Sequence, residues 1–145
     1  GISLAHVEAV VGDTAQREQA SVVDAVFAGR FAGLDLALVK LTGEGLDMGV
    51  LLGAVLRHAL ALMKARFALD SGRSARDAVA AMRLPYPRLA QAEAALGAWN
   101  ALKLKDAVAV LGAAMVAVRR DGEMIRPVAM RALWTLTRMA SSGRG

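Results

Sequence analysis

MGVLLGAVLRHALALMKARFALD, residues 48–70, follows Asp47, a residue type that favours the N-cap of a helix. Its apolar residues recur at helical spacing along two adjacent stripes. One stripe contains Leu52, Leu56, Ala59, Met63 and Phe67, and the other contains Leu51, Val55, Leu62 and Leu69. The edge that remains for solvent is narrow and consists of Arg57, Ala61, Lys64 and Ala68. Because a helix that is apolar around most of its circumference is buried, we predict that residues 47–70 form the central helix of a bundle.

Helical signals continue on both sides of this segment. Capping residues, glycine stops and prolines predict further helices over 3–11, 21–28, 31–42, 74–82, 87–98, 100–120 and 127–140. No segment alternates apolar and polar residues as a strand does, and no repeat of fixed period is evident. The predicted fold class is therefore all-α, a helical bundle of about seven or eight helices.

Polar stretches mark the predicted boundaries of the main domain. Ser3 caps the first predicted helix, Gly12-Asp13 ends it, and residues 14–20 are the predicted linker. Residues 21–140 then form the helical domain, and residues 141–145 are expected to be a disordered tail.

The predicted helix after Asn100 carries a single apolar seam. Its residues follow 4-3-4-3 spacing at Leu104, Val108, Leu111, Met115 and Val118. The small residues 112–114 allow a second helix to approach closely. They fit either an interface with a partner or the internal core, and the sequence leaves both open.

The composition excludes several classes of protein. The chain has no Cys, so disulfides, thiolate catalysis and Cys-ligated zinc are excluded, and a reducing cytoplasm is the expected location. No membrane span is expected, because Arg57 and Lys64 interrupt the most hydrophobic segment. The net charge of +5 lies entirely beyond Asn100. That excess suits an acidic partner or nucleic acid, although scattered surface arginines give the same total.

Candidate interface residues lie in this basic part. Arg131, Trp134 and Arg138 share one face of the last predicted helix, and Arg119 and Arg120 extend the positive charge. Arginine beside indole suits a protein or nucleic-acid contact. The alternative is a tryptophan in the core with arginines extending past it. The two arginines that end the preceding helix also complement its negative terminus.

No catalytic or cofactor site is predicted. His6 and His58 are the only histidines, too few for a metal cluster, and His58 lies on the apolar face of the central helix. We interpret it as a core or interface histidine. No phosphate-binding glycine loop or nucleophile elbow is present. We therefore expect no enzyme activity, no metal and no cofactor.

The order of short motifs resembles the C-terminal part of the delta subunit of the bacterial DNA polymerase III clamp loader. The motifs are Val7–Asp13 (VEAVVGD), Ala28–Arg30 (AGR), Leu34–Leu38 (LDLAL), Leu56–Leu60 (LRHAL), Trp99 with Leu102–Leu104 (LKL), Arg119–Gly122 (RRDG) and Arg131–Leu133 (RAL). The resemblance covers almost the whole chain. One departure is the break at residues 84–87 (LPYP), which is shorter and less basic than expected of the family.

The resemblance implies a collar domain that assembles with the helical domains of neighbouring clamp-loader subunits, within a DNA polymerase holoenzyme. Residues 1–13 would then end a preceding lid-like domain. By this resemblance, contact with the sliding clamp would belong to an N-terminal domain outside these residues, and the family's delta subunit does not hydrolyse ATP. DNA contact is expected to be weak. The alternative is a free-standing basic helical adaptor that binds nucleic acid or regulates another protein.

Overall fold

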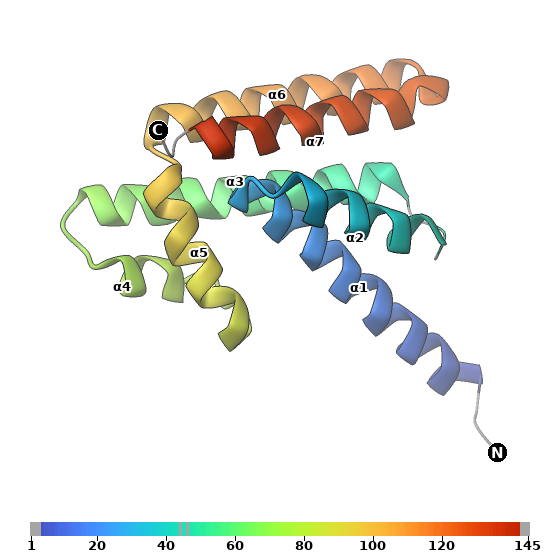
Figure 1. Ribbon diagram of the computed structural model, residues 1–145, viewed down its shortest axis with the longest axis horizontal. Helices are drawn as coiled ribbons and strands as arrows, with labels where there is room; N and C mark the ends of the chain where they lie inside the picture. Colours follow the sequence, from blue (N-terminus) through green and yellow to red (C-terminus); the bar gives the residue numbers. More distant parts are fainter. Residues whose placement is uncertain (1–3, 44, 46, 143–145) are drawn as a thin grey trace.

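The computed structural model describes the chain at residues 4–43, 45 and 47–142, with side chains described from residue 16 onward. These residues form seven α-helices and one 3-10 turn, without a β-strand among them, as predicted. In chain order they are α1 (Leu4–Ala28), α2 (Phe31–Gly43), α3 (Met48–Asp70), α4 (Ala75–Ala80), α5 (Tyr86–Ala98), α6 (Ala101–Arg120), η1 (Gly122–Met124) and α7 (Ile125–Ser142). Figure 1 shows α6 and α7 side by side along one side of α3, with α4 and α5 toward the other.

The central position predicted for residues 47–70 is confirmed. Helix α3 packs against α1, α4, α5, α6 and α7. At its start, Asp47 Oδ1 accepts hydrogen bonds from the backbone N–H groups of Gly49 and Val50, at 2.8 and 3.1 Å. The buried residues of α3 are Leu51, Leu52, Val55, Ala59, Leu62 and Ala65.

One residue of the predicted apolar stripes is exposed to solvent. Phe67 is 75% exposed. It lies about 120° around the helix from Val55, because each residue of an α-helix turns the chain by about 100°. The first stripe thus drifts away from the buried side toward the end of α3.

By length and composition, α3 is apolar enough to cross a membrane. The central helix of a globular protein has the same composition. The complete burial of Leu51, Val55 and Leu62 accounts for the apolar character of α3 within the bundle.

The predicted helix stop at Gly12-Asp13 is wrong. Helix α1 runs without interruption from Leu4 to Ala28, across the stretch that we predicted to be a linker. A glycine inside a helix costs only about 1 kcal/mol relative to alanine, and the alanine, glutamine, glutamate and arginine residues that follow are good helix formers. The predicted cap Ser3 lies outside the described residues, and the division into domains stays a prediction.

Helices α6 and α7 form an antiparallel pair. Asn100 caps α6 as predicted, since its Oδ1 accepts from Lys103 N at 2.8 Å. Helix α7 begins at Ile125 rather than at Pro127. Pro127 is tolerated inside the helix because the N–H groups of the first turn have no partner within the helix. It also includes Ser141 and Ser142, so these two residues do not belong to a disordered tail. Residues 143–145 lie outside the described residues.

The end of α1 is held by two distant parts of the chain. The buried Trp99 Nε1 donates a hydrogen bond to Phe27 O at 3.0 Å, and the two rings lie 5.3 Å apart. Gly29, with φ +72°, turns the chain into α2, and a Cβ on it would lie only 2.9 Å from Ser141 N. The last turn of α1 therefore fixes both the α5–α6 junction and the end of α7.

Candidate functional site

The binding face predicted on the last helix lies on the outer side of α7. Arg131, Trp134 and Arg138 are all exposed, and Trp134 is 45% exposed. The opposite side of α7 is buried at Ala129, Ala132, Leu133, Leu136 and Ala140. The alternative with Trp134 in the core is therefore wrong. Among the described residues, no guanidinium lies over the Trp134 ring, so stacking within the row does not occur.

The two other candidate arginines lie apart from the far end of this row. Arg119 and Arg120 occupy the last turn of α6 and are exposed. Arg138 lies near the end of α7, about 20 Å along its axis from the α6–α7 turn. The five candidates thus extend along the α6–α7 pair instead of forming one cluster.

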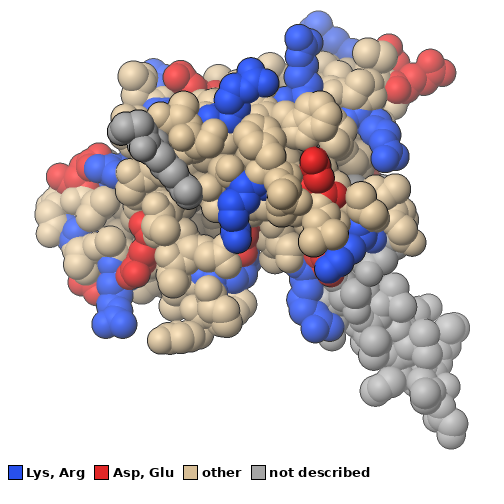
Figure 2. Space-filling view, in the orientation of Figure 1, with Lys and Arg blue, Asp and Glu red and all other residues tan. Residues whose placement is uncertain are grey.

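Positive charge on α6 and α7 is not neutralised locally. Within the described part of the chain, the ion pairs are Arg66–Asp70 and Arg88–Asp24, and neither involves a candidate residue. Figure 2 shows the Lys and Arg side chains of the viewed face mixed with Asp and Glu, without one continuous basic area. On that face the charge suits contact with a protein better than the phosphate rows of a duplex, which need several cations on one side.

The small residues of α6 line an open apolar groove. The groove has a volume of about 620 Å³ and is lined by Gly112, Ala113, Val116, Ala117, Arg120, Asp121, Met124 and Val128. A Cβ added at Gly112 would meet no atom within 4 Å. Ala114 alone of the three small residues is buried. Gly112 and Ala113 are therefore not needed for the approach of a helix within this bundle.

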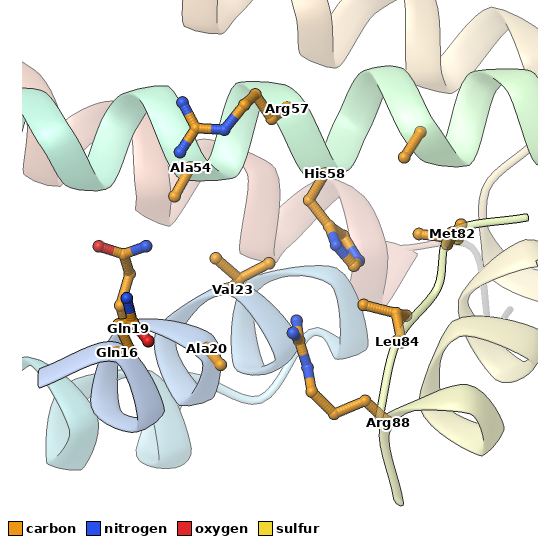
Figure 3. A pocket seen from close by; sticks show the side chains of 11 residues that line it. Gln16, Gln19, Ala20, Val23, Ala54, Arg57, His58, Met82, Leu84 and Arg88 are labelled. Carbon is orange, nitrogen blue, oxygen red and sulfur yellow. The ribbon is translucent and has the colours of Figure 1, made fainter. Parts of the chain in front are cut away.

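A second hollow lies between α1, α3 and the segment that joins α4 to α5, as Figure 3 shows. It has a volume of about 380 Å³. Its polar lining consists of Gln16, Gln19, Arg57, His58 and Arg88. Its apolar lining consists of Ala20, Val23, Ala54, Ala61, Met82 and Leu84. We call this hollow the His58 pocket.

Two contacts position the titratable side chains of the His58 pocket. Arg88 forms a bidentate ion pair with Asp24, with Nε–Oδ2 at 2.9 Å and Nη2–Oδ1 at 2.8 Å. The His58 ring lies 5.0 Å from the Phe27 ring, at an angle of 47°. Burial, together with the positive charge of Arg88, lowers the pKa of His58 from 6.5 to about 4, although Asp24 opposes the shift. The imidazole is therefore neutral at neutral pH.

Sequence reasoning did not bring these residues together. It interpreted His58 as a core or interface histidine, which agrees with its half-buried position against Phe27. Gln16 and Gln19 were missed because residues 14–20 were predicted to be a linker, and Arg88 was missed because nothing in its predicted helix, 87–98, relates it to His58. The available signal was the three-residue spacing of the two glutamines, which places them on one face once a helix is assumed.

The described residues contain no group of three His, Asp or Glu side chains that could hold a metal ion. Comparisons of the chain with models of protein families, with curated proteins and with solved structures found no match. Membership of a family, and any function that follows from it, therefore remains a proposal.

Proposed function

We propose that this chain is a non-catalytic assembly domain, and that it forms part of the helical collar of a cytoplasmic DNA polymerase III clamp loader as the C-terminal domain of a delta subunit. Its partners would be the helical domains of the other loader subunits. The parent complex loads the sliding clamp onto primed DNA. The order of the motifs quoted above supports the assignment to this family.

The observation that carries an assembly role is the apolar surface that the bundle leaves uncovered. Helix α2 buries Leu34, Ala37, Leu38 and Leu41 on one side. On its other side Leu36 is 60% exposed and Val39 is 70% exposed. A short helix that is apolar on both sides gains nothing from the second side in an isolated domain, whereas exposed apolar area is typical of surfaces that bind another protein.

Trp134 adds a second exposed contact of the same kind. Tryptophan and arginine are the residues that most often dominate the binding energy of an interface, and Arg131 and Arg138 flank Trp134 on the exposed side of α7. The charge of the row favours a partner that presents acidic side chains.

The test is size-exclusion chromatography with light scattering, on this chain alone and mixed with the other clamp-loader subunits from the same source. We expect a stable complex that contains the chain. A chain that elutes alone, under conditions in which the full-length loader assembles, would contradict the collar assignment.

Matched variants locate the interface. Trp134→Ala should weaken the complex at least tenfold, the loss that about 1.4 kcal/mol produces. Tyr86→Ala is the control. Tyr86 is 84% exposed at the start of α5, and its substitution also removes an aromatic ring. Equal affinity of the two variants would exclude Trp134 from the interface.

A basic nucleic-acid-binding adaptor is the second candidate. It is favoured by Arg119, Arg120, Arg131 and Arg138, which form no ion pair among the described residues. If the chain binds DNA through them, the logarithm of the affinity should fall steeply with the logarithm of the salt concentration. Strong, salt-dependent DNA binding together with no affinity for loader subunits would favour this adaptor over the collar.

A further inference from the structure

We propose that the His58 pocket binds an oxyanion, a phosphate or carboxylate group, with Arg57, Arg88, His58 and the two glutamines as its hydrogen-bond donors. The pocket is formed by α1, α3 and the start of α5, away from the exposed row on α7. The proposal does not depend on the assembly role.

The donors that line the pocket are available to a ligand. Of the Arg88 guanidinium, Nε and Nη2 bind Asp24, and Nη1 has no hydrogen-bond partner among the described residues. Within the same part of the chain, Gln16, Gln19 and Arg57 form no side-chain hydrogen bond or ion pair that would occupy them. Arg57 lies along α3 over Gly53, at the edge of the pocket, where it remains exposed.

The nitrogens of the His58 ring are also available to a ligand. The ring forms no hydrogen bond with a described residue. Every fully buried side-chain nitrogen or oxygen in the described part has a hydrogen-bond partner, so the unpaired ring nitrogens are not fully buried. They are therefore reachable from the pocket. A neutral imidazole donates one N–H and needs no counter-charge for this purpose.

The charge of the lining selects an anion. Two arginines and no carboxylate line the pocket. Asp24, the acid whose charge acts on His58, is already paired with Arg88. At the His58 ring the field of Arg88 acts more strongly than that of Asp24, so the pair leaves a net positive potential there. Such a potential repels a cationic ligand, whereas an oxyanion gains charge-assisted hydrogen bonds from it.

The remaining lining strengthens these contacts. In Figure 3, apolar side chains flank His58 and Arg88, with Val23 on one side and Met82 and Leu84 on the other. Hydrogen bonds to a charged group are stronger beside apolar side chains than in open water, since the local dielectric constant is lower.

In the experiment, the folded chain is titrated with inorganic phosphate while NMR monitors the His58 ring. A titration with sodium chloride of equal ionic strength is the reference. We expect a saturable shift with phosphate and a rise of the pKa of His58, because the bound anion opposes Arg57 and Arg88 and adds to the effect of Asp24. Acetate is the second arm. Saturation with acetate as well would show that a planar carboxylate suffices, and saturation with phosphate alone would identify a phosphate site.

Three variants distinguish a built site from diffuse attraction. Gln19→Leu and Arg57→Gln should each weaken phosphate binding about tenfold, as expected when a charge-assisted hydrogen bond is lost. Lys64→Gln removes an exposed charge from α3 outside the pocket and should leave the affinity within about twofold. Circular dichroism verifies that each variant is folded. The proposal is overturned if phosphate acts no differently from chloride, or if the Lys64 and Arg57 variants weaken binding equally.

Discussion

Two tryptophans of this chain lie in opposite surroundings. Trp99 is fully buried and its Nε1 satisfies the carbonyl of Phe27, whereas Trp134 is 45% exposed. Trp99→Phe leaves that carbonyl without its donor, so we expect the free energy of unfolding to fall by about 1–3 kcal/mol. Trp134→Phe should change it by less than about 0.5 kcal/mol. Urea denaturation followed by circular dichroism measures both, and equal losses would contradict the structural role of Trp99.

His58 makes stability depend on pH in a defined direction. Its pKa is about 4 in the folded chain against 6.5 in the unfolded chain. Below 6.5 the unfolded state binds a proton that the folded state does not, so the free energy of unfolding falls as pH decreases toward 4. This group alone contributes a loss of about 2 kcal/mol between about pH 7 and pH 5. His58→Gln should lose correspondingly less over that interval in denaturation experiments. Parallel pH profiles of the two proteins would contradict the buried neutral histidine.

At the scale of elements, two glycines test where helices approach closely. Gly29→Ala forces a left-handed φ on alanine and places its Cβ 2.9 Å from the backbone of Ser141. We expect a loss of more than about 1 kcal/mol. Gly112→Ala, in the middle of α6, meets open space and should raise the free energy of unfolding by about 0.5–1 kcal/mol. Thermal unfolding of both variants measures the difference, and the same sign for both would contradict the packing of α7 on the α1–α2 turn.

Helix α2 carries apolar side chains on two sides, one buried in the bundle and one exposed to solvent. Leu34 is fully buried, so Leu34→Ala should cost about 2–5 kcal/mol of unfolding free energy. Leu36 is 60% exposed, and Leu36→Gln should change stability by less than about 0.5 kcal/mol while weakening the complex with partner subunits. Denaturation and size-exclusion chromatography separate the two effects. A large loss of stability in Leu36→Gln would show that the outer side of α2 is covered within the chain itself.

At the scale of the whole molecule, one ion pair joins distant parts of the bundle. Asp24 of α1 and Arg88 of α5 are partly buried and bidentate, whereas Arg66 and Asp70 are neighbours on α3. Asp24→Asn should cost about 1–3 kcal/mol of unfolding free energy, since it weakens a pair of charge-assisted bonds. Asp70→Asn should cost less than about 1 kcal/mol. Chemical denaturation compares the two, and a larger loss for Asp70→Asn would contradict the linking role of Asp24.

Local chemistry predicted most of the secondary structure. The caps at Asp47 and Asn100 accept the expected backbone hydrogen bonds, and Ser74 Oγ, at the start of α4, accepts one from Asp77 N. The error at Gly12-Asp13 arose because a single glycine is a weak helix breaker when good helix formers follow it. The His58 pocket was not predicted, because its residues come from three helices and the segment between α4 and α5, and only tertiary packing brings these parts together.

Caps and apolar periodicity act over a few residues, so they were enough to predict the all-helical class, most of the helix ends and the central position of α3. The same local signals do not reveal that Trp99 is buried and Trp134 exposed, that Leu36 and Val39 of α2 remain uncovered, or that His58 and Arg88 line one pocket. Those outcomes depend on which helices pack together, and contacts between residues far apart in the chain set that arrangement.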